Sequence, residues 1–263
     1  KPAEDASLST MELAKLLQDI LPSGVLNVVP GYGQEAGQSL IDHPDIDKLA
    51  FTGSVEVGRL VGKTAGERIL PVTLELGGKA PHIVFPDVDI DRAVENATLG
   101  YTFFNGESCI LGTRLLIHED IYDQFVEKLI DRVKEVKIGD PTDRSTRLGA
   151  LINEKQGKRV LGYFDIAREE GAKILYGGNR VTVADHEYGY FIEPTIIEAE
   201  PHMRISQEEI FGPACTVTKW SDVEEVIQIA NDVDYGLAAG IMTDGLENAL
   251  GTANKLEAGS VWS

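Results

Sequence analysis

Short apolar runs alternate with amphipathic segments along the whole chain. Before residue 78, three runs are too short for helices and predict strands at residues 25–29, 49–51 and 72–76. Between the last two, Val57, Leu60 and Val61 fall on one helical face. Strands that alternate with helices indicate a parallel, doubly wound sheet, which places this part of the chain in the α/β class.

The same alternation continues to the end of the chain and predicts a second α/β unit. Strands are expected at residues 82–85, 114–118, 173–176, 216–219, 237–242 and 259–262, with residues 191–197 also extended. Amphipathic helices are expected at residues 90–104, 120–136, 154–170, 222–231 and 247–256. We therefore predict two α/β units, residues 1–77 and residues 78–263.

The composition of the chain argues against several kinds of binding partner. The 263 residues are 43% hydrophobic and carry a formal net charge of -19, which argues against nucleic acid because phosphate binding needs clustered Lys and Arg. No apolar run approaches the length of a membrane span, and no Cys/His cluster has metal-site spacing. The two cysteines indicate a reducing compartment, and we expect the cytoplasm. The chain begins without Met and stops straight after a predicted strand, so we expect a piece of a longer protein.

Cys109 is the first candidate for chemistry. It lies in a glycine-flanked turn between a predicted helix and a predicted strand, where backbone N–H groups can point at whatever reacts with the sulfur. A thiolate is the nucleophilic form of cysteine, and such surroundings favour it. The alternative is a small buried hydrophobe, which is what most lone cysteines are.

A second candidate stretch runs from Thr73 to Lys79. Glu75 stands there on a strand of apolar residues that ends in two glycines. A carboxylate inside an apolar strand is costly without a partner or a task, so we expect Glu75 to be buried and functional. Two loops ahead of predicted helices, residues 30–37 and 51–58, are rich in glycine and suit a phosphate, although neither has the Gly-x-Gly-x-x-Gly spacing. Ordinary helix-start turns explain them equally well.

These stretches together resemble the aldehyde dehydrogenase superfamily, of the NAD(P)-dependent, aldehyde-oxidising kind. Five stretches carry the resemblance in the family's order: Lys1–Glu4, Phe51–Gly58, Leu74–Lys79, Asn105–Arg114 and Glu208–Pro213. The resemblance implies that residues 1–77 are part of a Rossmann-like NAD-binding domain. It implies that residues 78–263 are the thiol-bearing catalytic domain, in a protein that forms homodimers or homotetramers.

The resemblance also implies roles for individual residues. Cys109 matches the nucleophile and Glu75 the general base. The positions that match cofactor-binding residues are Lys1, Glu4, Gly33, Gly37, Thr52, Gly53, Ser54, Leu76, Glu209 and Phe211. Glu4 favours NAD over NADP, because a carboxylate accepts hydrogen bonds from ribose hydroxyls and repels a 2′-phosphate.

The implied reaction oxidises an aldehyde to a carboxylic acid. The thiolate of Cys109 adds to the carbonyl, hydride passes to the nicotinamide, and Glu75 activates the water that hydrolyses the remaining thioester. Two features depart from the family pattern. Glu107 stands where Gln is most common, and no residue replaces the family's N-terminal Asn that helps to stabilise the oxyanion, a loss of about 10²–10³ in rate.

Three other readings remain open. The chain could be a truncated or non-catalytic relative, because both ends look cut. A CoA-acylating relative is disfavoured, since such relatives generally lack the base that Glu75 supplies. A cysteine protease would need a histidine directed at Cys109, and the nearest in sequence, His118, lies across a predicted strand.

Overall fold

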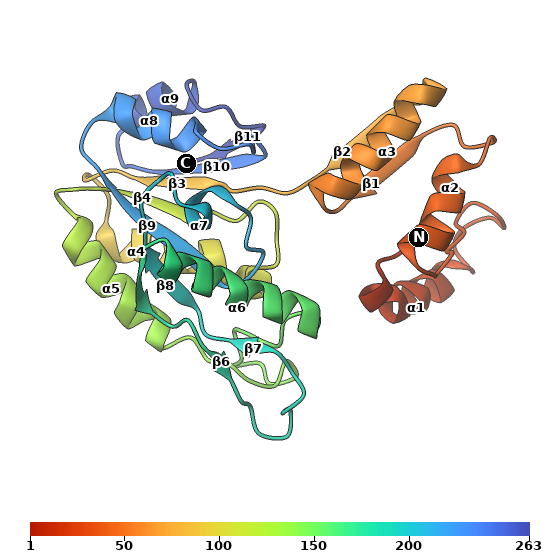
Figure 1. Ribbon diagram of the computed structural model, residues 1–263, viewed down its shortest axis with the longest axis horizontal. Helices are drawn as coiled ribbons and strands as arrows, with labels where there is room; N and C mark the ends of the chain where they lie inside the picture. Colours follow the sequence, from red (N-terminus) through yellow and green to blue (C-terminus); the bar gives the residue numbers. More distant parts are fainter. The chain divides into compact units, whose positions relative to one another are not determined.

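The computed structural model describes residues 1–263 as two compact units, Lys1–Leu76 and Gly77–Ser263 (Figure 1). The chain has the mixed α/β class predicted from its sequence, and most of its strand pairs are parallel. None of the helices combines the length and the apolarity needed to cross a lipid bilayer.

The first unit is built around one strand–helix–strand crossover. Strand β1 (Leu49–Thr52) pairs in parallel with β2 (Val72–Glu75), and α3 (Val55–Arg68) connects them. Before the crossover lie a 3-10 turn (Glu4–Ala6), α1 (Ser7–Leu17), a π-helical turn (Gly33–Gly37) and α2 (Gln38–Asp42). The buried core of this unit is small and consists of Leu49, Val61 and Ala65.

The strand predicted at residues 25–29 is wrong. Residues 25 and 26 form a bend, residues 27–29 have no regular structure, and Val25 is 65% exposed. A strand is stable only when a neighbour takes up its backbone hydrogen bonds, and the two-stranded sheet of this unit pairs only β1 with β2. Apolar spacing alone cannot reveal whether such a neighbour exists.

The second unit contains a seven-stranded sheet in the order β11-β10-β3-β4-β9-β8-β5. Its members are β3 (Pro81–Val84), β4 (Arg114–His118), β5 (Lys173–Tyr176), β8 (Thr195–Glu198), β9 (Ala214–Trp220), β10 (Ala238–Met242) and β11 (Ser260–Trp262). All neighbours are parallel except β5 and β8. A separate ribbon joins β6 (Arg180–Val181) to β7 (Phe191–Ile192), so the segment predicted as one extended stretch at residues 191–197 contributes to two sheets.

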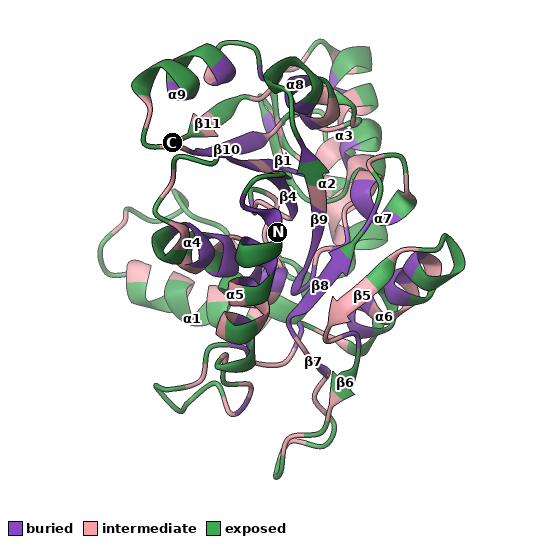
Figure 2. Ribbon diagram, turned by 90° about the vertical axis from the view of Figure 1, so that its left-hand side faces the viewer, coloured by how far each residue is buried: buried purple, intermediate pink, exposed green.

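Helices cover both faces of this sheet (Figure 2). On one face, α4 (Ile90–Thr102) and α5 (Tyr122–Lys134) bury an apolar cluster that includes Tyr101 and Phe125. On the other face lie α6 (Glu154–Glu169), the short α7 (Arg204–Gln207), α8 (Val223–Asn231) and α9 (Leu246–Ala253). Burial on both faces explains why the strands read as nearly continuous apolar runs.

Candidate active site

The turn that carries Cys109 is held in an unusual backbone conformation. Helix α4 ends at Thr102, and a short 3-10 segment (Phe103–Gly106) follows it. Within that segment Phe104, Asn105 and Gly106 have φ values of 49°, 60° and 73°, all in the left-handed region. The chain is thereby reversed between the helix and β4, and Cys109 is left partly exposed in the connecting turn.

Two glycines allow other segments to approach this turn. A Cβ atom on Gly78 would lie 2.1 Å from the carbonyl oxygen of Cys109. A Cβ on Gly106 would lie 2.1 Å from the carbonyl carbon of Gly212. The backbone therefore packs against backbone at distances that no side chain permits, and the Cys109 turn contacts both the Gly77–Lys79 segment and the loop that follows Phe211.

Glu209 lies against the same glycine segment. Its Oε1 accepts a hydrogen bond from the backbone N–H of Gly78 at 3.0 Å, and a Cβ on Gly77 would meet its Oε2 at 2.6 Å. Burial raises the pKa of Glu209, while the N–H of Gly78 and the cations Arg159 and Lys79 oppose that rise. Within the second unit, the Gly77–Gly78 segment thus contacts both the nucleophile candidate and a partly buried carboxylate.

Side chains of helix α6 hold the loop that contains Glu209 and Phe211 by hydrogen bonds to the backbone of that loop. The Gln156 side chain donates to the carbonyl of Phe211 at 2.5 Å, and that of Arg159 donates to the carbonyl of Glu209 at 2.7 Å. Phe211 itself has a left-handed φ of 59°, which an external support helps to maintain. The sequence analysis missed Gln156 and Arg159, because these contacts join positions 50 and 55 residues apart and have no local signal.

Lys79 is a third candidate to which the sequence analysis assigned no role. It is 2% exposed, and its Nζ has no hydrogen-bond partner. Burial, followed by repulsion from Arg114, lowers the pKa of Lys79 to about 7. The Arg114 side chain donates to the carbonyls of Lys79, Ile229 and Ala230 at 2.7 to 2.9 Å, which ties the end of α8 to this segment.

The first unit contains a pocket of about 710 Å³ beside β1 and the start of α3. Six of the predicted cofactor residues line it: Lys1, Glu4, Gly33, Gly37, Thr52 and Ser54. The Lys1 ammonium donates to Glu4 Oε1 at 3.1 Å and to the carbonyl of Gly31 at 2.9 Å. A backbone N–H bond and then the Lys1 ammonium lower the pKa of Glu4, so the pocket presents a carboxylate.

The other predicted residues of this unit lie next to the pocket. Gly53 donates its N–H to the carbonyl of Glu75 at 3.0 Å, and Leu76 packs so closely on Gly58 that a Cβ there would meet its side chain at 2.4 Å. Ser54 caps α3, and Ser54 and Val57 line the pocket, so the N-terminus of α3 borders it. A pocket with a helix N-terminus for phosphate and a carboxylate for a ribose fits a dinucleotide.

The expected burial of Glu75 is wrong. Glu75 is exposed, because it is the last residue of β2 and its side chain lies at the end of a two-stranded sheet. Glu75 belongs to the first unit and Cys109 to the second, so neither unit by itself brings this predicted pair together. His118 lies at the far end of β4 from Cys109, with its ring edge-on to Trp220 at 4.6 Å, and does not supply a protease-like base.

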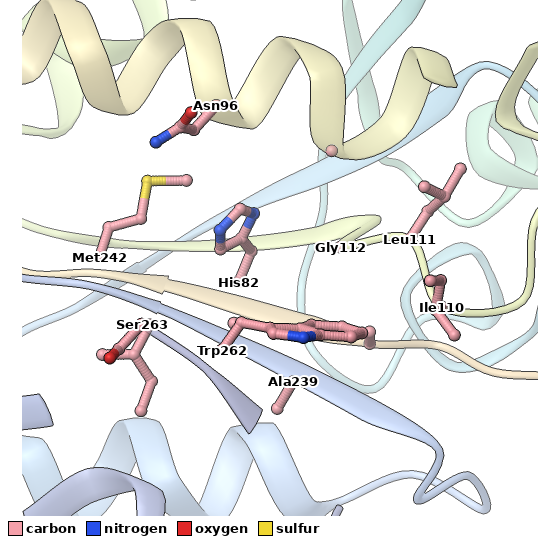
Figure 3. A pocket seen from close by; sticks show the side chains of 13 residues that line it. His82, Asn96, Ile110, Leu111, Gly112, Ala239, Met242, Trp262 and Ser263 are labelled. Carbon is pink, nitrogen blue, oxygen red and sulfur yellow. The ribbon is translucent and has the colours of Figure 1, made fainter. Parts of the chain in front are cut away.

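A cavity of about 430 Å³ borders the residues that follow Cys109. Figure 3 shows His82 rising from β3 toward Asn96 on α4, with Ile110 and Leu111 at one side and Trp262 below. The lining is mainly apolar, and Trp262 is 51% exposed there. Trp220 and Cys215, by contrast, are buried in the core.

Comparison with known proteins identifies the family. All 263 residues match the aldehyde dehydrogenase family. The chain belongs to the aldehyde dehydrogenase family. An aldehyde dehydrogenase from Enchytraeus buchholzi is 45% identical over 265 residues, which cover 100% of this chain and 52% of that protein. The family predicted from the sequence is therefore confirmed.

Solved structures of aldehyde dehydrogenases share the fold. The NAD+ complex of aldehyde dehydrogenase from Bacillus cereus superposes with a TM-score of 0.95 at 41% identity, covering 99% of this chain and 53% of that one. A point mutant of betaine aldehyde dehydrogenase from Staphylococcus aureus, in complex with NAD+ and with a BME-modified cysteine, gives a TM-score of 0.95 at 39% identity over 99% and 54% of the two chains. The chain spans about half the length of these relatives.

Proposed function

We propose that this chain carries the nucleophile, the base and much of the cofactor site of an enzyme that oxidises an aldehyde to a carboxylic acid with NAD. The observation that carries the proposal is the contact of the Cys109 turn with the Gly77–Gly78 segment, which also binds Glu209. Membership in the family supports the reaction class, and the NAD+ complexes of two relatives support the cofactor.

In this proposal Cys109 is the nucleophile. Its thiolate adds to the aldehyde carbon and forms a thiohemiacetal, whose oxyanion is stabilised in part by the backbone N–H of Cys109. The modified cysteine of the related betaine aldehyde dehydrogenase shows that a cysteine in that protein reacts with a small thiol reagent. Bound NAD would accept the hydride, which leaves a thioester on Cys109.

Glu75 would act as the base for hydrolysis of that thioester. It would take a proton from water as the oxygen attacks the acyl carbon, so that the carboxylic acid leaves and the Cys109 thiol is regenerated. Its exposure at the end of β2 leaves the carboxylate accessible to water. The role requires that Glu75 and Cys109 face one substrate in the working protein.

The first unit would hold the adenosine end of NAD. Lys1 and Glu4 would bind ribose hydroxyls, Gly33 and Gly37 would line the adenosine side, and the start of α3 at Ser54 would bind the pyrophosphate. In the second unit, Glu209 would bind the nicotinamide ribose and Phe211 would contact the ring, both held by Gln156 and Arg159. A Glu at position 4 favours NAD over NADP.

The test uses a polypeptide of full family length that contains this chain. Cys109→Ser is expected to abolish aldehyde-dependent formation of NADH, and activity that survives would rule out Cys109 as the nucleophile. Glu75→Gln is expected to leave one rapid turnover of NADH per active site and to lower the steady rate about 10²–10⁴-fold, because hydrolysis alone needs the base. Equal loss of the burst and the steady rate would contradict the role of Glu75.

A second candidate function is a non-catalytic relative that does not turn over by itself. The motivating observation is that the chain spans about half the length of its relatives. A purified protein with an intact mass near 28.6 kDa that shows no binding of NAD(H) by titration would favour this candidate. Dimer or tetramer formation and a cytoplasmic location remain predictions from the family resemblance.

A further inference from the structure

Two side chains of the turn that carries Cys109 form hydrogen bonds with residues 149–152. Asn105 Oδ1 accepts the N–H of Gly149 at 2.8 Å, and its Nδ2 donates to the carbonyl of Ala150 at 3.1 Å. The two carboxylate oxygens of Glu107 lie 3.1 and 3.2 Å from the backbone nitrogen of Ile152, whose N–H they accept. We call these contacts of Asn105 and Glu107 the staple.

The staple acts where the backbone most needs support. Phe104 and Asn105 are non-glycine residues in the left-handed region, a conformation that costs roughly 1–2 kcal/mol per residue and persists only when its surroundings fix it. Asn105 is itself one of these residues and makes both of its hydrogen bonds from the left-handed conformation. Glu107 follows directly after Gly106. The staple therefore restrains the strained segment on the N-terminal side of Cys109.

Residues 149–152, to which Asn105 and Glu107 bind, lead directly into α6. Asn153 caps this helix by accepting the N–H of Gln156 at 2.8 Å, and Gln156 and Arg159 then hold the backbone of Phe211 and Glu209. One helix thus connects the support of the Cys109 turn with the support of the predicted nicotinamide loop.

We propose that Asn105 and Glu107 are positioning residues for Cys109, which set the turn in register with the Glu209–Phe211 loop through residues 149–152 and α6. The inference rests on the proposed function only in that Cys109 is the reacting group. Neither residue needs to touch the substrate.

The hydrogen bond between the Glu107 carboxylate and the Ile152 N–H can be tested by changing the pH. Burial raises the pKa of Glu107, and the N–H of Ile152 opposes that rise. Residues 149–152 carry no ionisable side chain, Glu154 and Lys155 in the first turn of α6 are exposed, and Cys109 is the titratable neighbour on its own turn. Because a carboxylate accepts more strongly than a carboxylic acid, the bond to Ile152 weakens as Glu107 is protonated.

Hydrogen exchange of the 263-residue chain measures the staple itself. Glu107→Ala is expected to speed exchange of the Ile152 amide roughly fivefold to tenfold at pH 7, the effect of losing one hydrogen bond, and Glu107→Gln to restore part of the protection. The ratio of the Ile152 amide exchange rate in wild type to that in Glu107→Gln is expected to rise as the pH falls and Glu107 becomes protonated. Glu119→Gln, the same change at an exposed position, is the control. Unchanged exchange at Ile152 in Glu107→Ala would overturn the proposal.

Alkylation by iodoacetamide then tests the effect on Cys109. Asn105→Gly removes the two Asn105 hydrogen bonds of the staple and leaves those of Glu107. Glycine adopts the left-handed conformation freely, so the variant separates the loss of these hydrogen bonds from backbone strain. We expect alkylation of Cys109 to become several-fold faster, with Cys215, which is fully buried, as the unreactive internal reference. An unchanged rate would overturn the proposal.

Activity in a polypeptide of full family length separates this inference from the proposed function. Asn105→Gly is expected to lower kcat about 10–100-fold with a smaller change in KM, because a displaced nucleophile loses its alignment. If exchange and alkylation respond as expected while the wild-type polypeptide oxidises no aldehyde, the proposed function fails and the staple stands. A kcat unchanged in Asn105→Gly would overturn the positioning role.

Discussion

The two cysteines differ because of their surroundings. Cys109 is partly exposed in a turn whose backbone packs against Gly78. Cys215 lies in β9, is fully buried among apolar side chains, and has its pKa raised by that burial. A thiol that cannot ionise is a poor nucleophile, so the residue-level environment favours Cys109 for chemistry.

His82 gives a pH-dependent prediction at the same scale. Its Nδ1 is buried with no hydrogen-bond partner, and its ring occupies the space beside Gly100, Gly112 and Gly240. Burial lowers the pKa of His82 to about 4. Protonation therefore favours the unfolded chain, where the pKa is ordinary, so the stabilising contribution is full above about pH 6.5 and is lost as the pH falls toward 4.

We expect the free energy of unfolding of wild type to drop by roughly 2 kcal/mol more than that of His82→Asn between pH 7.5 and 4.5, since one pKa unit corresponds to about 1.4 kcal/mol. Denaturant titrations at the two pH values measure this difference. His202→Asn, at an exposed histidine, serves as the control. Parallel pH dependences of wild type and His82→Asn would contradict the assignment.

At the scale of elements, the site depends on close approach of backbone segments that precede or follow strands. Gly78 and Gly106 allow three parts of the chain to meet: the Gly77–Lys79 segment, the turn after α4 and the loop before β9. Gly106 also has a φ of 73°, so a larger residue there meets two penalties, strain and collision.

Gly106→Ala is expected to destabilise the chain by roughly 2–4 kcal/mol, because the added Cβ would collide with the backbone of Gly212 and the left-handed conformation would be strained. Gly162→Ala, in the interior of α6 with open space around the position, is the matched control and should stabilise by about 0.5–1 kcal/mol. Thermal unfolding of both variants checks the pair. A Gly106→Ala variant as stable as wild type would disprove the close approach.

At the scale of the whole molecule, the two units differ in the size of their cores. The second unit buries three apolar clusters around its seven-stranded sheet, whereas the first buries Leu49, Val61 and Ala65 around two strands. Stability grows with the share of surface that folding removes from water, so a short chain with a small core is marginal.

We therefore expect residues 77–263 expressed alone to unfold in one cooperative transition, and residues 1–76 alone to show no cooperative transition. Circular dichroism during heating measures both, with the 263-residue chain as reference. NAD at about 100 times its Kd should raise the stability of the folded unit that binds it by about 2.7 kcal/mol. A cooperative transition of residues 1–76 without ligand would show that the small core suffices.

Periodicity and short motifs are local properties of a chain. They were therefore enough to predict the α/β class, most strands and helices, the family, and Cys109 and Glu75 as candidate site residues. Strand pairing, burial and long-range hydrogen bonds depend on which residues are neighbours in space, and these could be read only from the folded chain. Residues 25–29 are not a strand because no strand pairs with them, and Glu75 is exposed because it ends β2. Asn105, Gln156 and Arg159 acquired their positions through contacts that join residues 44 to 55 positions apart. Only folding brings such positions together, since hydrogen bonds and burial depend on distances in space.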